Sequence, residues 1–309
     1  MQQKYDLYET KNTRTGEIVS NNFVKNDGSE EFKTNVTKKL NYGQINYLNK
    51  SDELKSMNAE LGGFINMCYV SNKLLFNELN IDRANISRLI YLATYIDYNN
   101  RQENVLIKYT KHRTIETMTK NDIKDILKLS DRAFANFMKD MKNNNLIYEA
   151  FNKVYISREY FSKGKCNFKS GEYTRIYIYP TRSLYMSCTS RQHKQLSYIY
   201  QLIPFMNKEL NIICKNPNET DISKLEKLTL KDICELLGLS TEQRSMRKLR
   251  DELIKFYIKI DGKKYFFLSY ARVLNGYGLK DYFIINPNVC WSGNNMDNLK
   301  ETLNLCYFK

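Results

Sequence analysis

Two stretches of the chain carry basic and amide side chains at the spacing of an exposed helical face, one within residues 131–144 and one from residue 241 on. Arginine can form two hydrogen bonds with the edge of guanine, and asparagine or glutamine can do so with adenine. These residue types therefore indicate base recognition in DNA, although each could instead be a solvated surface charge. The predicted base-reading residues are Arg132, Asn136 and Lys139 in the first stretch and Gln243, Arg244, Arg247 and Lys248 in the second.

A second set of polar residues lies where a predicted helix begins or a predicted hairpin turns. Backbone N–H groups at helix starts bind phosphate, and such contacts position a protein without specifying a sequence. Basic residues at a wing tip fit the minor groove or the backbone. The predicted contacts are Thr119, Lys120, Ser130, Thr229, Lys231 and Ser240 at helix starts and Lys153, Arg158, Lys263 and Lys264 at hairpins.

The apolar spacing around the first stretch predicts the elements that would position these residues. Residues 119–129 repeat apolar side chains on one helical face, and Thr119 followed by Asp122 resembles a capping box. A second helix is predicted for residues 131–144, followed by short strands at 146–149 and 154–157. Helix, short turn, helix and hairpin is the order of a winged helix-turn-helix.

The same order recurs 110 residues later in the chain. The first helices align without a gap, whereas the second copy gains about one residue in its turn. Its hairpin is predicted as 256–260 and 265–270 around Asp261-Gly262, a strong hairpin signal. Long helices at 86–98 and 191–207 precede the two copies. The matching residues are Thr229, Asp232, Ile233, Leu237, Leu239 and Ser240, at the offset of Thr119, Asp122, Ile123, Leu127, Leu129 and Ser130.

The charge of the chain favours a polyanionic partner. The formal net charge is +14 and the pI is near 9.2, and neutralising phosphates with such charges releases counterions. Residues 111–165 and residues 227–283 each contain twelve Lys and Arg against seven Asp and Glu. The positive charge could instead reflect a basic proteome from an AT-rich genome. The helix-turn-helix pairs could also bind only protein. Because Asp131 and Ala135 lie on its outer face, the first copy is expected either to bind DNA more weakly than the second or to help form a dimer.

The predicted fold class is α+β, mainly helical, with two tandem winged helix-turn-helix domains and small β-wings. The predicted divisions are a polar N-terminal segment at 1–60, domains at 61–170 and 171–293, and a tail at 294–309. Within the first segment, strands are expected at 5–10 and 17–23, with a mobile loop at 26–31. Strands are also expected at 62–68 and at 171–179, the latter joining the two domains. Its tyrosines favour sheet packing over stacking on single-stranded bases.

No motif for catalysis stands out. The two histidines, His112 and His193, lie too far apart in sequence for the paired metal-binding histidines of a rolling-circle nuclease, and no Gly-Lys-Ser/Thr of a P-loop occurs. We therefore expect no enzyme activity, cofactor or metal. The seven scattered cysteines favour reduced thiols in the cytoplasm. No N-terminal signal or membrane-length apolar run is visible.

The order of two winged-helix domains joined by a strand and a long helix resembles the replication initiator (Rep) proteins of plasmids and phages. The residues that carry this likeness are Met118-Thr119-Lys120-Asn121-Asp122-Ile123, Leu129-Ser130-Asp131-Arg132-Ala133-Phe134 and Tyr282-Phe283-Ile284-Ile285-Asn286-Pro287. The resemblance implies binding to repeated origin sites on double-stranded DNA, host replication proteins as partners, and homodimers in some members. A phage or plasmid transcription regulator and a protein-interaction module that inhibits a host machine are the alternatives.

Overall fold

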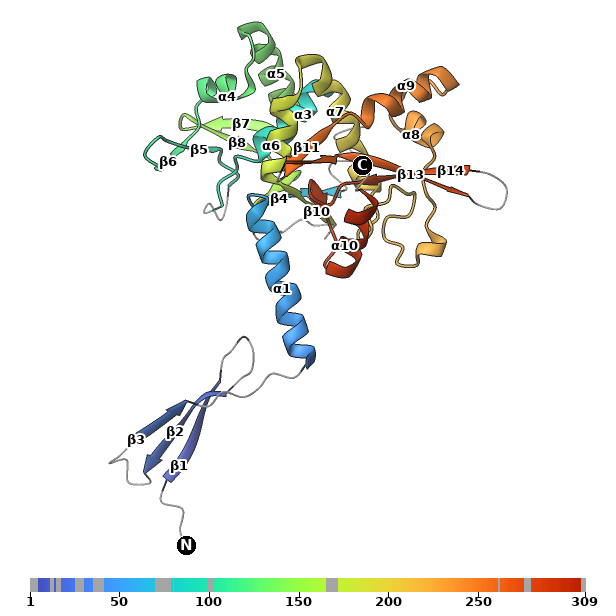
Figure 1. Ribbon diagram of the computed structural model, residues 1–309. Coiled ribbons are helices and arrows are strands. Elements are labelled where there is room, and N and C mark those ends of the chain that lie inside the picture. The colour runs from blue at the N-terminus through green and yellow to red at the C-terminus, as the bar shows by residue number, and fades with distance from the viewer. Residues whose placement is uncertain are drawn as a thin grey trace. The chain divides into compact units, whose positions relative to one another are not determined.

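The computed structural model describes residues 5–11, 14, 18–25, 31–35, 42–69, 79, 81–98, 103–164, 172–260, 262–274 and 279–306. The fold is α+β, with several helices and small antiparallel sheets (Figure 1). Contacts within the chain divide it into two compact units, Met1–Ser56 and Met57–Lys309.

The first unit contains a three-stranded antiparallel sheet. Its strands are β1 (Tyr5–Lys11), β2 (Ile18–Lys25) and β3 (Glu31–Asn35), in that order across the sheet. The first two strands agree with the predicted hairpin, but β3 and helix α1 (Tyr42–Glu60) were not predicted. Most of the predicted loop at 26–31 lies outside the described residues, apart from Glu31, which begins β3.

The second unit is built around a four-stranded sheet in the order β15-β10-β4-β9. Strand β10 (Tyr173–Tyr177) pairs antiparallel with β4 (Phe64–Cys68) on one side and β15 (Cys290–Trp291) on the other. Strand β9 (Phe161–Ser162) completes the sheet beside β4. Inward side chains such as Ile65 and Ile176 are fully buried, so strands far apart in the sequence share one core.

The strand predicted for residues 171–179 is too long at its C-terminal end. Residues 178–180 already belong to helix α6 (Ile178–Ser187), and Pro180 lies in its first turn. A proline is tolerated there because the first N–H groups of a helix have no partner within the helix. Pro180, directly after the strand predicted at 171–179, therefore lies in the first turn of a helix.

Helices α3 (Arg83–Ala93) and α7 (Ser190–Leu202) pack against each other at the centre of this unit. Both end earlier than the predicted helices at 86–98 and 191–207, and α7 is followed by the short 3-10 helix η1 (Ile203–Phe205). Asp82 caps α3 by accepting a hydrogen bond from the N–H of Ala84. Nine of the residues of α3 are buried, because the helix has neighbours on most of its surface.

The first predicted copy folds as two helices followed by a hairpin. Helix α4 (Lys120–Leu127) and helix α5 (Asp131–Asn143) are joined by a three-residue turn. Strands β7 (Ile147–Ala150) and β8 (Lys153–Ile156) form the hairpin. A further hairpin, β5 (Ile107–Tyr109) with β6 (Ile115–Thr117), lies just before α4.

The second copy repeats the helices and the first hairpin but adds another. Helices α8 (Leu230–Leu236) and α9 (Gln243–Leu253) are followed by β11 (Tyr257–Ile260) and β12 (Lys263–Phe266). The prediction of one continuous strand at 265–270 was wrong. It breaks at Phe267, and β13 (Leu268–Leu274) pairs instead with β14 (Leu279–Ile285).

The residues after β15 contain helix α10 (Met296–Leu305) within the segment predicted as a tail. Its Met296 and Leu299, together with Cys306, are buried. Cys306 packs with Ile212 and Ile284, which places the C-terminal helix against β14. The 3-10 helix η2 (Ile222–Lys224) lies in the connection between η1 and α8.

One continuous cluster of buried side chains joins both copies. It contains Ile123 and Phe137 from the first copy, Ile233 and Leu249 from the second, and Leu89 of α3. Figure 1 shows the two helix pairs, green α4–α5 and orange α8–α9, flanking the central helices. The boundary predicted between residues 170 and 171 stays a prediction, and residues 165–171 lie outside the described part of the chain.

Candidate nucleic-acid interface

Helices α4 and α8, the first helix of each copy, both begin with a capping box. The N–H of Thr119 donates to Oδ2 of Asp122 at 2.8 Å, and the N–H of Asp122 donates back to Oγ1 of Thr119 at 3.4 Å. Thr229 and Asp232 repeat these bonds at 2.8 and 3.2 Å. Each capping box satisfies two N–H groups that a helix start leaves unpaired. Both predicted boxes are confirmed.

The residue before each capping threonine also has an equivalent role. The N–H of Met118 donates to the carbonyl of Leu106 at 2.8 Å, and the N–H of Leu228 donates to the carbonyl of Ile213 at 3.0 Å. Leu106 and Ile213 each lie in an isolated β-bridge, so in both copies a bridge residue earlier in the chain holds the residue before the capping threonine. The repeat thus extends from the sequence pattern to the hydrogen bonds.

The second helix of each copy buries one face and exposes the other. In α5, Phe137, Met138 and Met141 are buried, whereas in α9 Leu249 and Leu253 are buried. The hydroxyl of Ser130 caps α5 by accepting from the N–H of Ala133. Glu242, and not Ser240, is the N-cap residue of α9. The turn of the second copy is therefore longer, and Ser240 instead accepts from the N–H of Glu242 within it.

All of the predicted contact residues lie on the surface. They are exposed whether they come from the helix starts, the second helices or the hairpins. The exposed set is Thr119, Lys120, Ser130, Arg132, Asn136, Lys139, Lys153, Arg158, Thr229, Lys231, Ser240, Gln243, Arg244, Arg247, Lys248, Lys263 and Lys264.

The cations predicted to contact DNA from the first helices have ion pairs, whereas those predicted to do so from the second helices have none with any described residue. On the first helices, Nζ of Lys120 lies 2.8 Å from a carboxylate oxygen of Glu149, and Nζ of Lys231 lies 3.8 Å from one of Glu235. On the second helices, five cations have no ion pair with any residue that the structure describes: Arg132, Lys139, Arg244, Arg247 and Lys248. Their charges are therefore available to an anionic partner.

The start of α5 is less favourable for an anion than the start of α9. Asp131, the first residue of α5, forms an ion pair with Lys124 of α4. This pair neutralises a lysine and leaves a carboxylate beside the helix start. The corresponding residue of α9 is Gln243, followed at once by Arg244. The positive charge is consequently denser on the second copy, as the sequence predicts.

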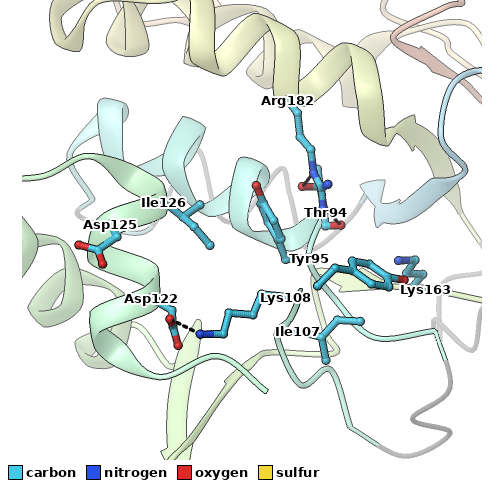
Figure 2. Close-up of a pocket in the computed structure, with 10 residues that line it drawn as sticks. Thr94, Tyr95, Ile107, Lys108, Asp122, Asp125, Ile126, Lys163 and Arg182 are labelled. Carbon is cyan, nitrogen blue, oxygen red and sulfur yellow. Dashed lines mark hydrogen bonds and ion pairs between the residues drawn. The ribbon is translucent and has the colours of Figure 1, made fainter. Parts of the chain in front are cut away.

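A hollow of about 440 Å³ lies beside α4, between α3, α6 and the β5 strand (Figure 2). Three cations line it, and each has a partner in the protein. Nζ of Lys108 lies 2.6 Å from Asp122, Lys163 donates to the carbonyl of Ile96 at 3.0 Å, and Arg182 donates to the hydroxyl and carbonyl of Thr94. Burial lowers the pKa of Lys163.

The side chains that line the hollow therefore hold the start of helix α4 in place. Lys108 binds the same Asp122 that closes the capping box, so strand β5 and the start of α4 are tied together. In Figure 2 the Asp125 carboxylate points away from Lys108. These side chains do not form a nucleophile–base pair or an ordered acid–base pair.

Cysteine and histidine side chains are spread through the unit. Among the residues with described positions, no group of three or more His, Cys, Asp and Glu side chains is placed to hold a metal ion. Burial raises the pKa of the Cys214 thiol to about 11 and that of Cys306 to about 12, which makes both poor nucleophiles at neutral pH. In the same described part, no helix has the length and apolar character needed to cross a bilayer.

One exposed hairpin tip, and one exposed residue in a turn that was predicted, were not identified from the sequence. Lys111, His112 and Arg113 form the exposed tip between β5 and β6, and Arg113 has a φ of 60°. Phe151 forms the tip between β7 and β8. The first could have been found from three basic or polar residues between short apolar runs. The second is a phenylalanine in a turn predicted at 150–153, and its exposure has no local sequence signal.

Helices α6 and α3 each donate a side-chain hydrogen bond to the end of the first helix of one copy. The hydroxyl of Tyr185 in α6 donates to the carbonyl of Leu127 at the end of α4, at 3.2 Å. Nη2 of Arg83 in α3 donates at 2.7 Å to the carbonyl of Leu237, the position equivalent to Leu127 in the second copy. Helix α4 is thus held by Tyr185 of α6, and helix α8 is held by Arg83 of α3.

No protein-family model, curated protein or solved structure matches this chain.

Proposed function

We propose that the protein binds double-stranded DNA in a sequence-specific manner through two winged helix-turn-helix units. The first unit would comprise α4, α5, β7 and β8, and the second α8, α9, β11 and β12. Helices α5 and α9 would be the recognition helices, which enter the major groove in this class of domain. The observation that carries the proposal is the recurrence of a helix pair whose first helix starts with a capping box and whose second helix exposes cations that have no ion pair with any described residue.

The charge and amide types on these faces support base reading as well as phosphate binding. Arg244 and Arg247 of α9 suit guanine, and Asn136 of α5 suits adenine. The cations at helix starts and hairpins would hold the phosphates on either side. Because α9 carries three cations without described ion pairs against two on α5, the second copy would contribute more of the affinity.

The biological role that we propose is replication initiation on a plasmid or phage, with host replication proteins as further partners. The support is the resemblance of the unit order and of residues 118–123, 129–134 and 282–287 to Rep proteins. Transcription regulation by the same two units, and protein binding without DNA, predict different results in the experiment below.

The test is selection of bound fragments from the DNA on which the gene lies. Enrichment of several iterated repeats beside an AT-rich stretch would support initiation. A single operator over a promoter would favour regulation. Absence of any enriched fragment would contradict DNA binding and favour the interaction module.

Substitutions on α9 then test the recognition helix. Arg244→Ala and Arg247→Ala should each cost about 1–3 kcal/mol of affinity for the selected fragment, which corresponds to a rise in Kd of about fivefold to 150-fold. Lys224→Ala is the matched control, because Nζ of Lys224 lies 3.5 Å from Asp221 and its charge is already partly neutralised. Gel shifts in which both arginine variants bind as tightly as the control would contradict the assignment of α9.

A further inference from the structure

Phe151 is the most exposed large apolar side chain in the described part of the chain. It is 93% exposed, and the next most exposed, Tyr109, is at 68%. Burying a phenylalanine is normally one of the main gains of folding, since apolar area leaves water. A phenylalanine this exposed contributes nothing of that kind to the fold.

The backbone at Phe151 is also unfavourable for this residue type. Ala150 pairs with Lys153, so Phe151 and Asn152 form a two-residue hairpin turn, with φ of 50° and 58°. Such turns favour asparagine, aspartate and glycine, because bulky side chains seldom adopt positive φ. The equivalent turn of the second copy contains Asp261-Gly262, and Gly262 has a φ of 77°. The first copy therefore presents a phenylalanine where the turn itself does not favour one.

The hairpin that carries Phe151 is held firmly on the helix pair. Glu149 of β7 accepts ion pairs from Lys120 of α4 at 2.8 Å and from Lys142 of α5 at 2.7 Å. The rings of Tyr148 and Tyr155 stack across the two strands, with centroids 4.9 Å apart. These contacts fix the strands that carry the tip relative to α4 and α5.

The surroundings of the tip favour a polyanionic partner over an apolar protein surface. Asn152 and Lys153 follow Phe151, and Lys153 is exposed without an ion pair to any described residue. A docking site for a protein typically gathers several apolar side chains into one patch. Phe151 is the one aromatic ring in this turn, since the half-exposed Tyr148 lies further back along β7 and stacks on Tyr155. A lone ring beside polar and basic residues is the arrangement of a wedge in proteins that kink DNA.

We propose that Phe151 inserts between neighbouring base pairs of the bound duplex and unstacks that step. The inference rests on the proposed function, because it needs the first copy to lie on DNA. Insertion would bury the exposed ring, and the cations of the helix pair and of Lys153 would hold the adjacent phosphates. The first wing would then open or kink the duplex, whereas the second wing, which has Gly262 in its turn and no aromatic residue there, would not.

The probe is a closed circular plasmid that carries the gene's own DNA, relaxed by topoisomerase I in the presence of the protein. Insertion of a ring unwinds the helix, so the wild-type protein should shift the linking number of the plasmid. Phe151→Asn should abolish that shift at equal occupancy, measured by gel shift on the same plasmid. Since asparagine suits positive φ, this variant should melt at the wild-type temperature or above it.

A second readout follows the wedge directly. The chain has one tryptophan, Trp291, which is fully buried, so the indole introduced by Phe151→Trp is the exposed one. Its emission should fall and its quenching by acrylamide should decrease when the plasmid is added. An indole that stays as accessible to acrylamide as in the free protein would overturn the insertion.

The outcomes separate the wedge from DNA binding itself. A shift in linking number that Phe151→Asn retains, or wild-type binding without any shift, overturns the wedge and leaves the proposed function standing. A wild-type protein that does not bind the plasmid overturns both.

Discussion

Two threonine–aspartate pairs determine where the first helix of each copy begins. In each pair the residues lie three apart, so the interaction depends only on local sequence and could be predicted. The start of α9 could not be predicted in the same way. Ser240 matches Ser130 in the alignment, but the longer second turn moves the N-cap to Glu242, which donates its N–H to Ser240 instead of capping with its side chain.

Removing a capping threonine should destabilise the fold measurably. Thr119→Ala and Thr229→Ala should each lower the free energy of unfolding by about 1 kcal/mol, because a helix N–H group loses its acceptor. Urea denaturation followed by circular dichroism measures this change.

Thr241→Ala provides the matched control for these variants. Thr241 is exposed in the turn before α9 and is not a capping residue. Its replacement should change the unfolding free energy by less than about 0.5 kcal/mol. Equal losses in all three variants would contradict the capping role.

At the scale of elements, the sequence pattern predicted both helix pairs, because their apolar stripes repeat at helical spacing. It failed where tertiary pairing decides the structure. Residues 171–179 alternate as a strand would, yet β10 ends at Tyr177, where α6 begins. The strand predicted across Phe267 breaks there, and the residues after it form β13, which pairs with β14 only four residues further along the chain in a hairpin that we did not predict.

The packing of α3, α6 and α7 includes a buried histidine that should make stability depend on pH. The ring of His193 stacks on Tyr185 with centroids 4.2 Å apart, and its Nε2 lies 3.1 Å from the carbonyl of Tyr185. Burial, with a smaller effect of Arg88, lowers the pKa of His193 below its usual value. The folded protein therefore keeps this ring neutral at pH values where the unfolded chain protonates it.

The stability should accordingly fall as the pH is lowered from about 6.5, the ordinary histidine pKa, towards the lower pKa of the folded state. His193→Gln should remove this part of the pH dependence, although it should also lower stability at pH 7 by losing the ring stack. Urea midpoints at pH 7, 6 and 5 measure the effect.

The only other histidine gives the control. His112 lies exposed at the tip between β5 and β6, so His112→Gln should keep the wild-type slope. A His193→Gln protein that loses stability between pH 7 and 5 as steeply as the wild type would contradict the role given to burial.

At the scale of the molecule, both copies are fixed to the same central helices. Arg83 reaches Leu237 across 154 residues of sequence, and the hydroxyl of Ser87 donates to the carbonyl of His193 at 2.7 Å. No periodicity reveals contacts of this range, so the sequence predicted two copies without predicting their shared core. The two helices that we propose as recognition helices, α5 and α9, are therefore packed on one shared core.

The sequence predicts which residues of the candidate interface are exposed, but it does not predict which of them form ion pairs with one another. Its exposed residues follow from helical spacing, because buried and exposed positions alternate regularly on α5 and α9. The ionic partners could not be predicted, since Glu149 reaches Lys120 and Lys142 only after the hairpin folds back. The strained and exposed position of Phe151 likewise depends on the hairpin register.

Binding of the full chain to DNA fragments over a series of salt concentrations tests the central claim most directly. Fluorescence anisotropy with a selected duplex gives the affinity at each concentration. Cations that neutralise several phosphates predict a logarithm of affinity that falls linearly with the logarithm of salt, with a slope of about −0.9 per phosphate. Affinity that does not change with salt, or no binding even at low salt, would contradict it.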